Sequence, residues 1–165
     1  MLWRLVLAAA LGAALGLERS LAGKHAGMRT YALVSTGSAM FVIISVMASY
    51  ELSSFAGVNP LQIASNVVLG VGFLGTGLAV FRGDHPVELT TAAGLWVSAG
   101  VGMAAGFGFS ILAFGAAVLA VLILSLLLGV ENNVRTKYTS EYTSAPLRVR
   151  KTTRKKGQKT LPTVE

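Results

Sequence analysis

A run of 40 residues, from Thr91 to Val130, contains no charged side chain. A single α-helix of that length would extend about 60 Å, twice the roughly 30 Å thickness of a bilayer's hydrocarbon core. The run must therefore fold back once, and the Gly106-Phe107-Gly108 segment is the best position for the turn. This feature alone predicts two adjacent membrane-spanning helices.

The composition of the whole chain also favours a membrane protein. Hydrophobic residues make up 53% of the chain and charged residues 13%, whereas soluble domains carry about 25% charged residues. The absence of cysteine excludes disulfides, thiolate zinc sites and cysteine nucleophiles. Two histidines, His25 and His85, are too few for a histidine-rich metal site. No arrangement of nucleophile, base and oxyanion donors is visible, so we expect neither an enzyme nor a bound cofactor.

Three further apolar runs have roughly the 20 residues that a membrane-spanning helix needs. The five predicted spans cover residues 2–17, 31–50, 63–81, 91–106 and 109–130. We therefore predict an all-α integral membrane protein, a five-helix bundle over residues 1–130 followed by a basic, disordered cytoplasmic tail over 131–165. A cleaved signal peptide is an alternative for the first span, because it is short, alanine-rich and carries one early arginine.

The distribution of basic residues predicts the orientation of the five spans. The first loop holds Arg19, Lys24 and Arg29, the third holds Arg82, and nine more basic residues follow Val130. If these segments share one side, that side has 13 basic residues and the other has only Arg4. The positive-inside rule then predicts an outside amino terminus and a cytoplasmic carboxyl terminus.

The segment from Gly70 to Gly77 reads GVGFLGTG and contains the spelling of a dinucleotide-binding turn. That motif has meaning only after a strand and at the start of a helix. Here the glycines lie inside the third apolar run, so we interpret them as packing residues of a membrane helix.

Small residues spaced four apart allow membrane helices to approach closely. Gly12 and Gly16 form one such ridge on the first span. A longer ridge lies on the fourth span and consists of Gly94, Ser98, Gly102 and Gly106. The fifth span is rich in leucine, isoleucine and valine from Leu119 to Leu128, which predicts a lipid-facing helix.

The third span has small residues on two faces, which predicts a position at the centre of the bundle. One face holds Asn66, Gly70 and Gly77, and the nearly opposite face holds Gly72, Gly75 and Ala79. A functional alternative is that the face with Asn66 and Gly70 lines a polar cavity. Asn66 could equally make one interhelical hydrogen bond, worth under about 1 kcal/mol, and packing is the preferred interpretation.

A charged cluster is predicted where the first span ends and the second begins. It consists of Glu18, Arg19, Arg29 and Thr30. Charged residues at membrane depth are costly and often functional, so this cluster is a candidate for binding an ion or a partner, or for sensing pH. The structural alternative is a Glu18–Arg29 ion pair that holds two helix ends together, with Arg19 and Lys24 at the lipid headgroups.

The third loop and the tail offer two further candidate sites. Asp84 and Glu88 could provide oxygen ligands to Mg²⁺, although two acids in such a loop are more often simply solvated. Thr90 and Thr91 would cap the fourth span or lie beside a pathway. The segment from Arg148 to Lys159 contains seven basic residues, which favours attachment to anionic lipid. It lacks the interleaved aromatic residues that stack nucleic-acid bases.

Three segments resemble the MgtC/SapB family of bacterial membrane proteins. They read LGAALGLERSLAGKHAGMRTYALVSTGSAMF from Leu11, IASNVVLGVGFLGTG from Ile63 and LTTAAGLWVSAGVGMAAGFG from Leu89. The resemblance covers about the first 110 residues. It implies a five-span domain in the bacterial inner membrane with its amino terminus outside, and a role in magnesium homeostasis and growth at low magnesium. In pathogens it also implies a virulence-associated role, survival inside host cells.

Two departures from the family pattern limit what the resemblance implies. Many members have a basic residue and a glycine where this chain has Val87 and Glu88. Longer members also have a folded carboxyl-terminal domain, for which the 35 residues after Val130 are too few. We therefore expect a short form without that cytosolic domain.

Members of the family have been viewed as accessories of magnesium uptake, modulators of membrane potential and inhibitors of the proton-driven ATP synthase. The leading hypothesis is accordingly a regulatory or accessory protein that contacts another membrane protein or a second copy of itself. The alternative is a small oligomeric transporter or channel for Mg²⁺ or protons.

Overall fold

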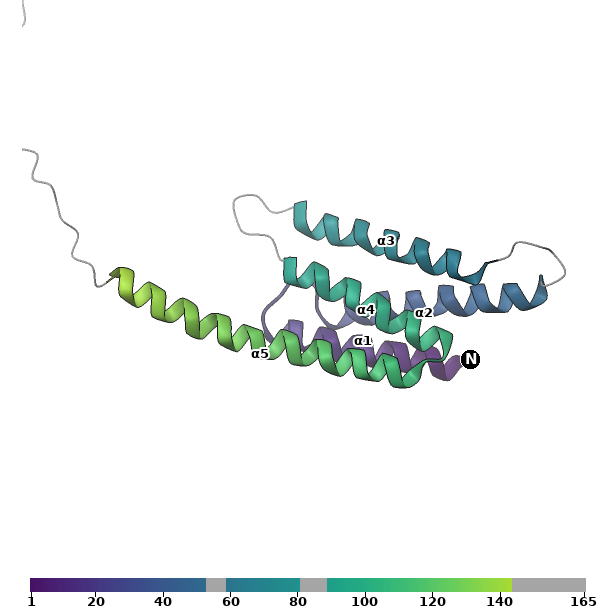
Figure 1. Cartoon of the computed structure of the whole chain (residues 1–165), viewed down its shortest axis with the longest axis horizontal. Helices are drawn as coiled ribbons and strands as arrows, with labels where there is room; N and C mark the ends of the chain where they lie inside the picture. The colour runs from purple at the N-terminus through teal and green to yellow at the C-terminus, as the bar shows by residue number, and fades with distance from the viewer. Residues whose placement is uncertain (53–58, 81–88, 144–165) are drawn as a thin grey trace, which may run out of the picture. The chain divides into compact units, whose positions relative to one another are not determined.

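The computed structural model describes residues 1–52, 59–80 and 89–143, and these residues contain five α-helices and no strand (Figure 1). The helices are α1 (Leu2–Leu21), α2 (Met28–Glu51), α3 (Pro60–Val80), α4 (Leu89–Phe107) and α5 (Ser110–Thr143). One helix covers each apolar run identified in the sequence. The prediction of an all-α membrane protein is confirmed.

Four of the five helices in the described part of the chain are long and apolar enough to cross a membrane. These are α2, α3, α4 and the part of α5 up to Gly129. The remaining helix, α1, carries Arg4, Glu18 and Arg19 within its 20 residues. The chain is therefore a multi-pass membrane protein.

The turn between α4 and α5 lies where the glycine spacing predicted it. Gly108 has a φ of +92°, a conformation that glycine adopts without strain. The N–H of Phe109 donates to the carbonyl oxygen of Ala104 and the N–H of Gly108 to that of Ala105, at 2.8 and 3.0 Å. This is the Schellman pattern of a helix end. It allows the long uncharged run to reverse direction within two residues.

Arg4 contacts this turn from α1. Its Nη1 donates a hydrogen bond to the carbonyl oxygen of Gly106 at 3.0 Å. A Cβ at Gly108 would lie 2.8 Å from the Arg4 Nη2 atom. The positive charge thus satisfies a carbonyl at the carboxyl end of α4, where the helix dipole favours a cation.

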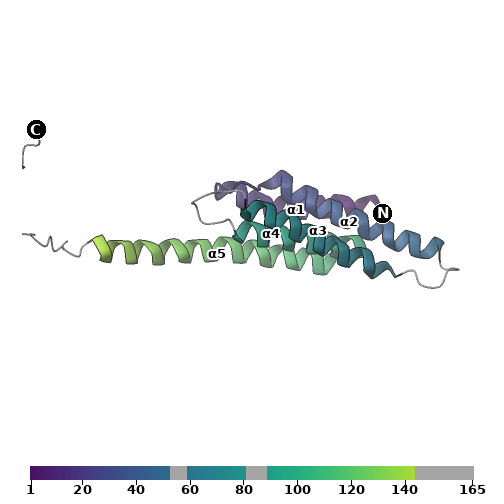
Figure 2. The ribbon, with the colours of Figure 1, turned by 90° about the horizontal axis from the view of Figure 1, so that it is seen from above.

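The core of the compact unit formed by residues 1–129 is built around α1, α2 and α4. Each of these helices packs against the other two, whereas α3 packs against α2 and α4 (Figures 1 and 2). The buried apolar side chains include Leu15 of α1, Tyr31 of α2 and Leu95 of α4. Ala113 and Ala117 contribute a small buried face from α5.

The prediction that the third span lies at the centre is wrong. An added Cβ at Gly70, Gly72 or Gly77 would meet no atom within 4 Å, and one at Gly75 would make only an ordinary contact with Ala92. Small residues allow close approach but do not enforce it, because a partner helix must present a matching surface. In this structure the matching surface on α2 contacts α4 instead of α3.

The large apolar side chains of the fifth span are exposed, as the prediction of a lipid-facing helix requires. Leu119, Leu122, Ile123, Leu126 and Leu127 are all between 48% and 63% exposed. In a bilayer, this surface is compatible with lipid chains.

The last helix extends beyond the predicted fifth span. No proline or glycine interrupts residues 130–143, and α5 continues to Thr143, 13 residues past the predicted boundary at residue 130. The second compact unit starts at Val130. The basic segment from Arg148 to Lys159 lies outside the described residues.

Candidate functional site

The fourth-span ridge forms a backbone-to-backbone contact with α2. A Cβ at Gly102 would overlap the carbonyl group of Ser35, and one at Gly106 would lie 2.8 Å from the carbonyl oxygen of Ala39. From the other side, a Cβ at Gly12 of α1 would lie 2.7 Å from the Ser35 Cβ. Both predicted glycine ridges are therefore confirmed, and α2 lies between them.

Tyr31 is the polar centre of this contact, with its side chain fully buried. Its hydroxyl donates to the carbonyl oxygen of Thr91 at 2.9 Å. Its own carbonyl oxygen accepts a hydrogen bond from the Ser98 hydroxyl at 2.9 Å. Gly94 leaves room for the ring, because a Cβ there would lie 3.2 Å from two ring carbons. Tyr31 thus joins α2 to α4 through both its side chain and its backbone.

Ser35 lies one turn after Tyr31 and is fully buried. Its hydroxyl has no hydrogen-bond partner among the described residues. A serine in a helix commonly donates to the carbonyl four residues earlier. Here that carbonyl belongs to Tyr31, which already accepts from Ser98. The hydrogen bond from Ser98 of α4 therefore takes the place of the one that the Ser35 hydroxyl would make within α2.

Glu18 and Arg19 form a buried ion pair in the last turn of α1. The Arg19 Nε and Nη2 atoms donate to the two carboxylate oxygens of Glu18 at 2.5 and 2.8 Å. The Arg19 side chain is 2% exposed and that of Glu18 is 12% exposed. Such a two-bond pair is the strong form of a charged hydrogen bond. It occupies both carboxylate oxygens.

The predicted charged cluster is only partly assembled. Glu18 and Arg19 are together, but Arg29 and Thr30 are exposed. The alternative Glu18–Arg29 pair is not formed, because Arg19 holds the carboxylate. The expected position of Arg19 at the lipid headgroups is also wrong, since its side chain is buried. The buried residue at the start of α2 is Tyr31, which directly follows Thr30 and is the first residue of the predicted second span.

Thr90 and Thr91 lie inside α4, which begins at Leu89, so the prediction that they cap this helix is wrong. Thr90 is exposed, whereas Thr91 is fully buried and hydrogen-bonded. Two successive residues of α4 thus differ in burial because their side chains point in different directions from the helix axis.

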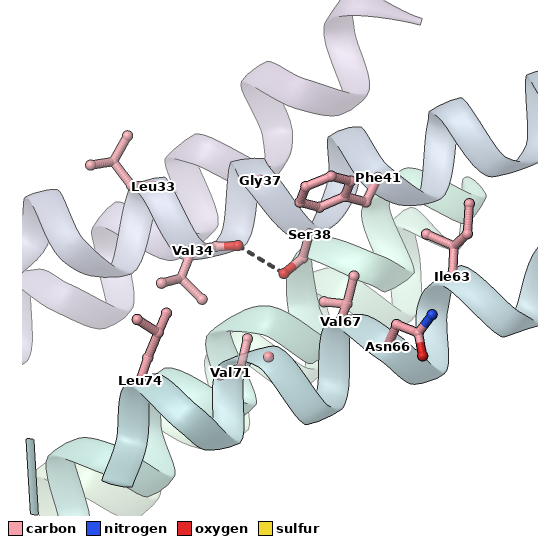
Figure 3. Close-up of a pocket in the computed structure, with 11 residues that line it drawn as sticks. Leu33, Val34, Gly37, Ser38, Phe41, Ile63, Asn66, Val67, Val71 and Leu74 are labelled. Carbon is pink, nitrogen blue, oxygen red and sulfur yellow. Dashed lines mark hydrogen bonds between the residues drawn. The ribbon is translucent and has the colours of Figure 1, made fainter. Parts of the chain in front are cut away.

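Asn66 and Gly70 line a groove between α2 and α3 (Figure 3). The groove is predominantly apolar, so the hypothesis of a polar cavity on this face is wrong. Asn66 is exposed, and its amide makes no hydrogen bond to another described residue. The interhelical bond considered for Asn66 is therefore not formed within the described part of the chain.

The candidate magnesium ligands Asp84 and Glu88 lie outside the described residues. Within residues 1–52, 59–80 and 89–143, no group of three histidine, cysteine or acidic side chains is placed to hold a metal ion. Among the polar groups that the structure brings together in the described core are the Glu18–Arg19 pair and the hydrogen bonds that join Tyr31 to Ser98 and to the Thr91 carbonyl.

The sequence model of the MgtC family matches residues 5–133, which include most of α1, all of α2, α3 and α4, and most of α5. The chain belongs to the MgtC family. The match covers both glycine ridges, the Glu18–Arg19 pair and Tyr31. No solved structure matches the chain.

Three relatives illustrate this similarity. The protein named "Putative magnesium transporter YhiD" of Escherichia coli (strain K12) is 42% identical over 125 residues, covering 74% of this chain and 58% of the relative. Protein SrpB of Synechococcus elongatus is 43% identical over 115 residues, covering 64% of this chain and 63% of SrpB. Protein MgtC of Salmonella typhimurium (strain LT2) is 42% identical over 104 residues, covering 63% of this chain and 42% of MgtC. The chain thus spans about half the length of these relatives.

Proposed function

We propose that this MgtC-family protein has a regulatory or accessory role in magnesium homeostasis, and that it acts by contacting another membrane protein. The magnesium link is supported by the family match and by the name of YhiD. Modulation of the ATP synthase or of a transporter is the form of this role that we favour. The protein acts without enzymatic chemistry and without a bound cofactor.

The observation that carries the proposal is the close packing of the α1–α2–α4 core. The backbone of α2 contacts both glycine ridges, and the core hydroxyl of Tyr31 is engaged by α4. A core of this kind acts as a rigid scaffold, because packed interiors transmit strain and deform little. The surfaces of α3 and α5 remain accessible, and large side chains such as Leu69 and Phe73 are 74% and 80% exposed.

The proposed orientation has the amino terminus outside and the carboxyl terminus in the cytoplasm, as the distribution of basic residues predicts. The natural absence of cysteine makes this testable without a background substitution. A Lys24→Cys variant in the α1–α2 loop should resist an impermeant thiol reagent in intact cells. A Phe109→Cys variant at the α4–α5 turn should be labelled. The reverse pattern would contradict the orientation.

The experiment for function is growth at limiting magnesium of cells that depend on this protein. We expect Glu18→Gln to abolish growth rescue, because it leaves the buried Arg19 without its counter-charge. Glu51→Gln is the matched control, since Glu51 is exposed at the other end of α2. Rescue by Glu18→Gln at the level of Glu51→Gln would show that the ion pair is dispensable for function.

A further inference from the structure

An apolar groove of about 620 Å³ runs between α2 and α3 (Figure 3). Leu33 and Leu74 lie at one end of it, and Phe41 and Ile63 lie at the other (Figure 3). Its volume is within the range of about 300–1,000 Å³ that small-ligand sites occupy. The α3 residues that line the groove, Ile63 to Leu74, lie within the candidate membrane span Leu61–Leu78, which places the groove at the depth of the hydrocarbon core.

The residues that line the groove leave space for a thin apolar ligand. Gly37 of α2 and Gly70 of α3 both line it, and an added Cβ at either position would meet no atom within 4 Å. The Ser38 hydroxyl donates to the carbonyl oxygen of Val34 at 2.8 Å, so its hydrogen is already used within α2 (Figure 3). The two glycines therefore widen the groove, and the Ser38 hydroxyl does not need a hydrogen-bond acceptor from the ligand.

A polar, positively charged surface adjoins one end of this groove. Arg29 and Thr30 are both exposed, and each lies four residues before a groove residue, Leu33 and Val34 respectively. Residues four apart are neighbours on one side of a helix. A guanidinium and a hydroxyl therefore lie one turn beyond the apolar lining, where they could bind a phosphate.

The length of the groove matches one leaflet of a bilayer. Leu33 and Phe41 are eight residues apart, which is about 12 Å along a helix. Half of the hydrocarbon core is about 15 Å. A ligand with an anionic head beside Arg29 would therefore have its apolar part in the groove, extending toward Phe41 and Ile63.

We propose that this groove binds one acyl chain of an anionic phospholipid, whose phosphate contacts Arg29 and Thr30. A helix from a second copy is about 10 Å or more in diameter. It would not enter a groove between two helices that already contact each other. This assignment depends on the groove and its charged end, and it is independent of any role in magnesium homeostasis.

The test is native mass spectrometry of the full-length protein in detergent, with dioleoyl phosphatidylglycerol or dioleoyl phosphatidylcholine added. The wild type should retain phosphatidylglycerol in preference to phosphatidylcholine. Gly70→Leu and Gly37→Leu fill the groove from opposite walls and should each lower retained phosphatidylglycerol about tenfold, the factor that 1.4 kcal/mol represents. Gly72→Leu is the matched control, because Gly72 also has open space but does not line the groove.

The head-group contact is tested separately with Arg29→Gln. This variant should lose the preference for phosphatidylglycerol while retaining both lipids at the level of phosphatidylcholine. Lys24→Gln, a basic residue of the adjacent loop, should keep the preference. Equal retention by Gly70→Leu, Gly37→Leu and Gly72→Leu would place the lipid elsewhere, for example on the basic segment 148–159, and would overturn the proposal. A change of oligomeric state in both groove-filling variants would also overturn it, because the occupant would then be protein.

Discussion

Tyr31 of α2 donates its hydroxyl hydrogen to the carbonyl oxygen of Thr91 in α4, 2.9 Å away, and so joins the first turns of two helices that are 60 residues apart in sequence. Both residues are fully buried. This bond and the Ser98 bond to the Tyr31 carbonyl make the α2–α4 contact specific in register as well as closely packed.

Replacing Tyr31 by phenylalanine should destabilise the protein modestly. The ring stays in place, but one interhelical hydrogen bond is lost, and such bonds in membrane proteins average about 0.6 kcal/mol with a maximum of about 1.7. Unfolding in a denaturing detergent measures the change. Tyr50→Phe is the control, because Tyr50 is 79% exposed. An equal loss in both variants would contradict the assigned role of the Tyr31 hydroxyl.

Ser98→Ala and Ser35→Ala should have different effects although both serines are fully buried. Ser98→Ala removes the bond to the Tyr31 carbonyl and should cost about 0.6 kcal/mol. Ser35→Ala removes a hydroxyl without a partner among the described residues, so it should leave stability unchanged or raise it. The same detergent unfolding assay compares the two. A larger loss for Ser35→Ala would show that its hydroxyl has a partner, such as buried water.

Gly102→Ala should be strongly destabilising, because the new Cβ would overlap the backbone of Ser35. Overpacking of a close contact typically costs about 1–3 kcal/mol. Gly77→Ala provides the comparison, since it adds a Cβ in open space. The greater helix propensity of alanine should make it neutral or stabilising, by up to about 1 kcal/mol. The ranking of these variants by thermal stability in detergent would be reversed if α3, rather than α4, were the central helix.

Glu18→Gln should destabilise by about 3–5 kcal/mol, because it leaves the buried Arg19 guanidinium without a counter-charge. The double variant Glu18→Gln/Arg19→Met should recover much of that loss, since it removes the unpaired charge as well. Folded yield and thermal stability measure both effects. A double variant as unstable as the single one would mean that Arg19 is stabilised by groups other than Glu18.

The helices and the two glycine ridges could be predicted from the sequence because they depend on local patterns. The uncharged run from Thr91 to Val130 is too long for one span, and the row from Gly94 to Gly106 defines one helix face. The position of α3 could not be predicted, since the glycines from Gly70 to Gly77 permit contact on two faces without specifying a partner. Only the matching surface of α2, at Ser35 and Ala39, shows that α4 takes the central place.

Only part of the candidate site could be predicted, because helix–helix contacts decide which of its residues are buried. The Glu18–Arg19 region was identified because charge at membrane depth is conspicuous. Tyr31 and Thr91 are each directly next to a predicted residue, but successive residues on a helix point about 100° apart. Which of two neighbours is buried depends on the contact between α2 and α4, which no local pattern contains. The ion pair within one turn of α1 was missed because residues at i and i+1 do not ordinarily face each other.

The central claim, that this protein acts through contacts in the membrane rather than by moving ions, is tested most directly by flux into liposomes. The purified full-length chain is reconstituted alone, and Mg²⁺ and proton entry are followed with trapped fluorescent indicators. The protein used for reconstitution must have the same sequence as the protein that rescues growth at limiting magnesium in cells. We predict rescue in cells and flux no greater than that of protein-free liposomes. Mg²⁺ or proton flux that rises with the amount of protein and is lost in Glu18→Gln would contradict the account and favour the transporter.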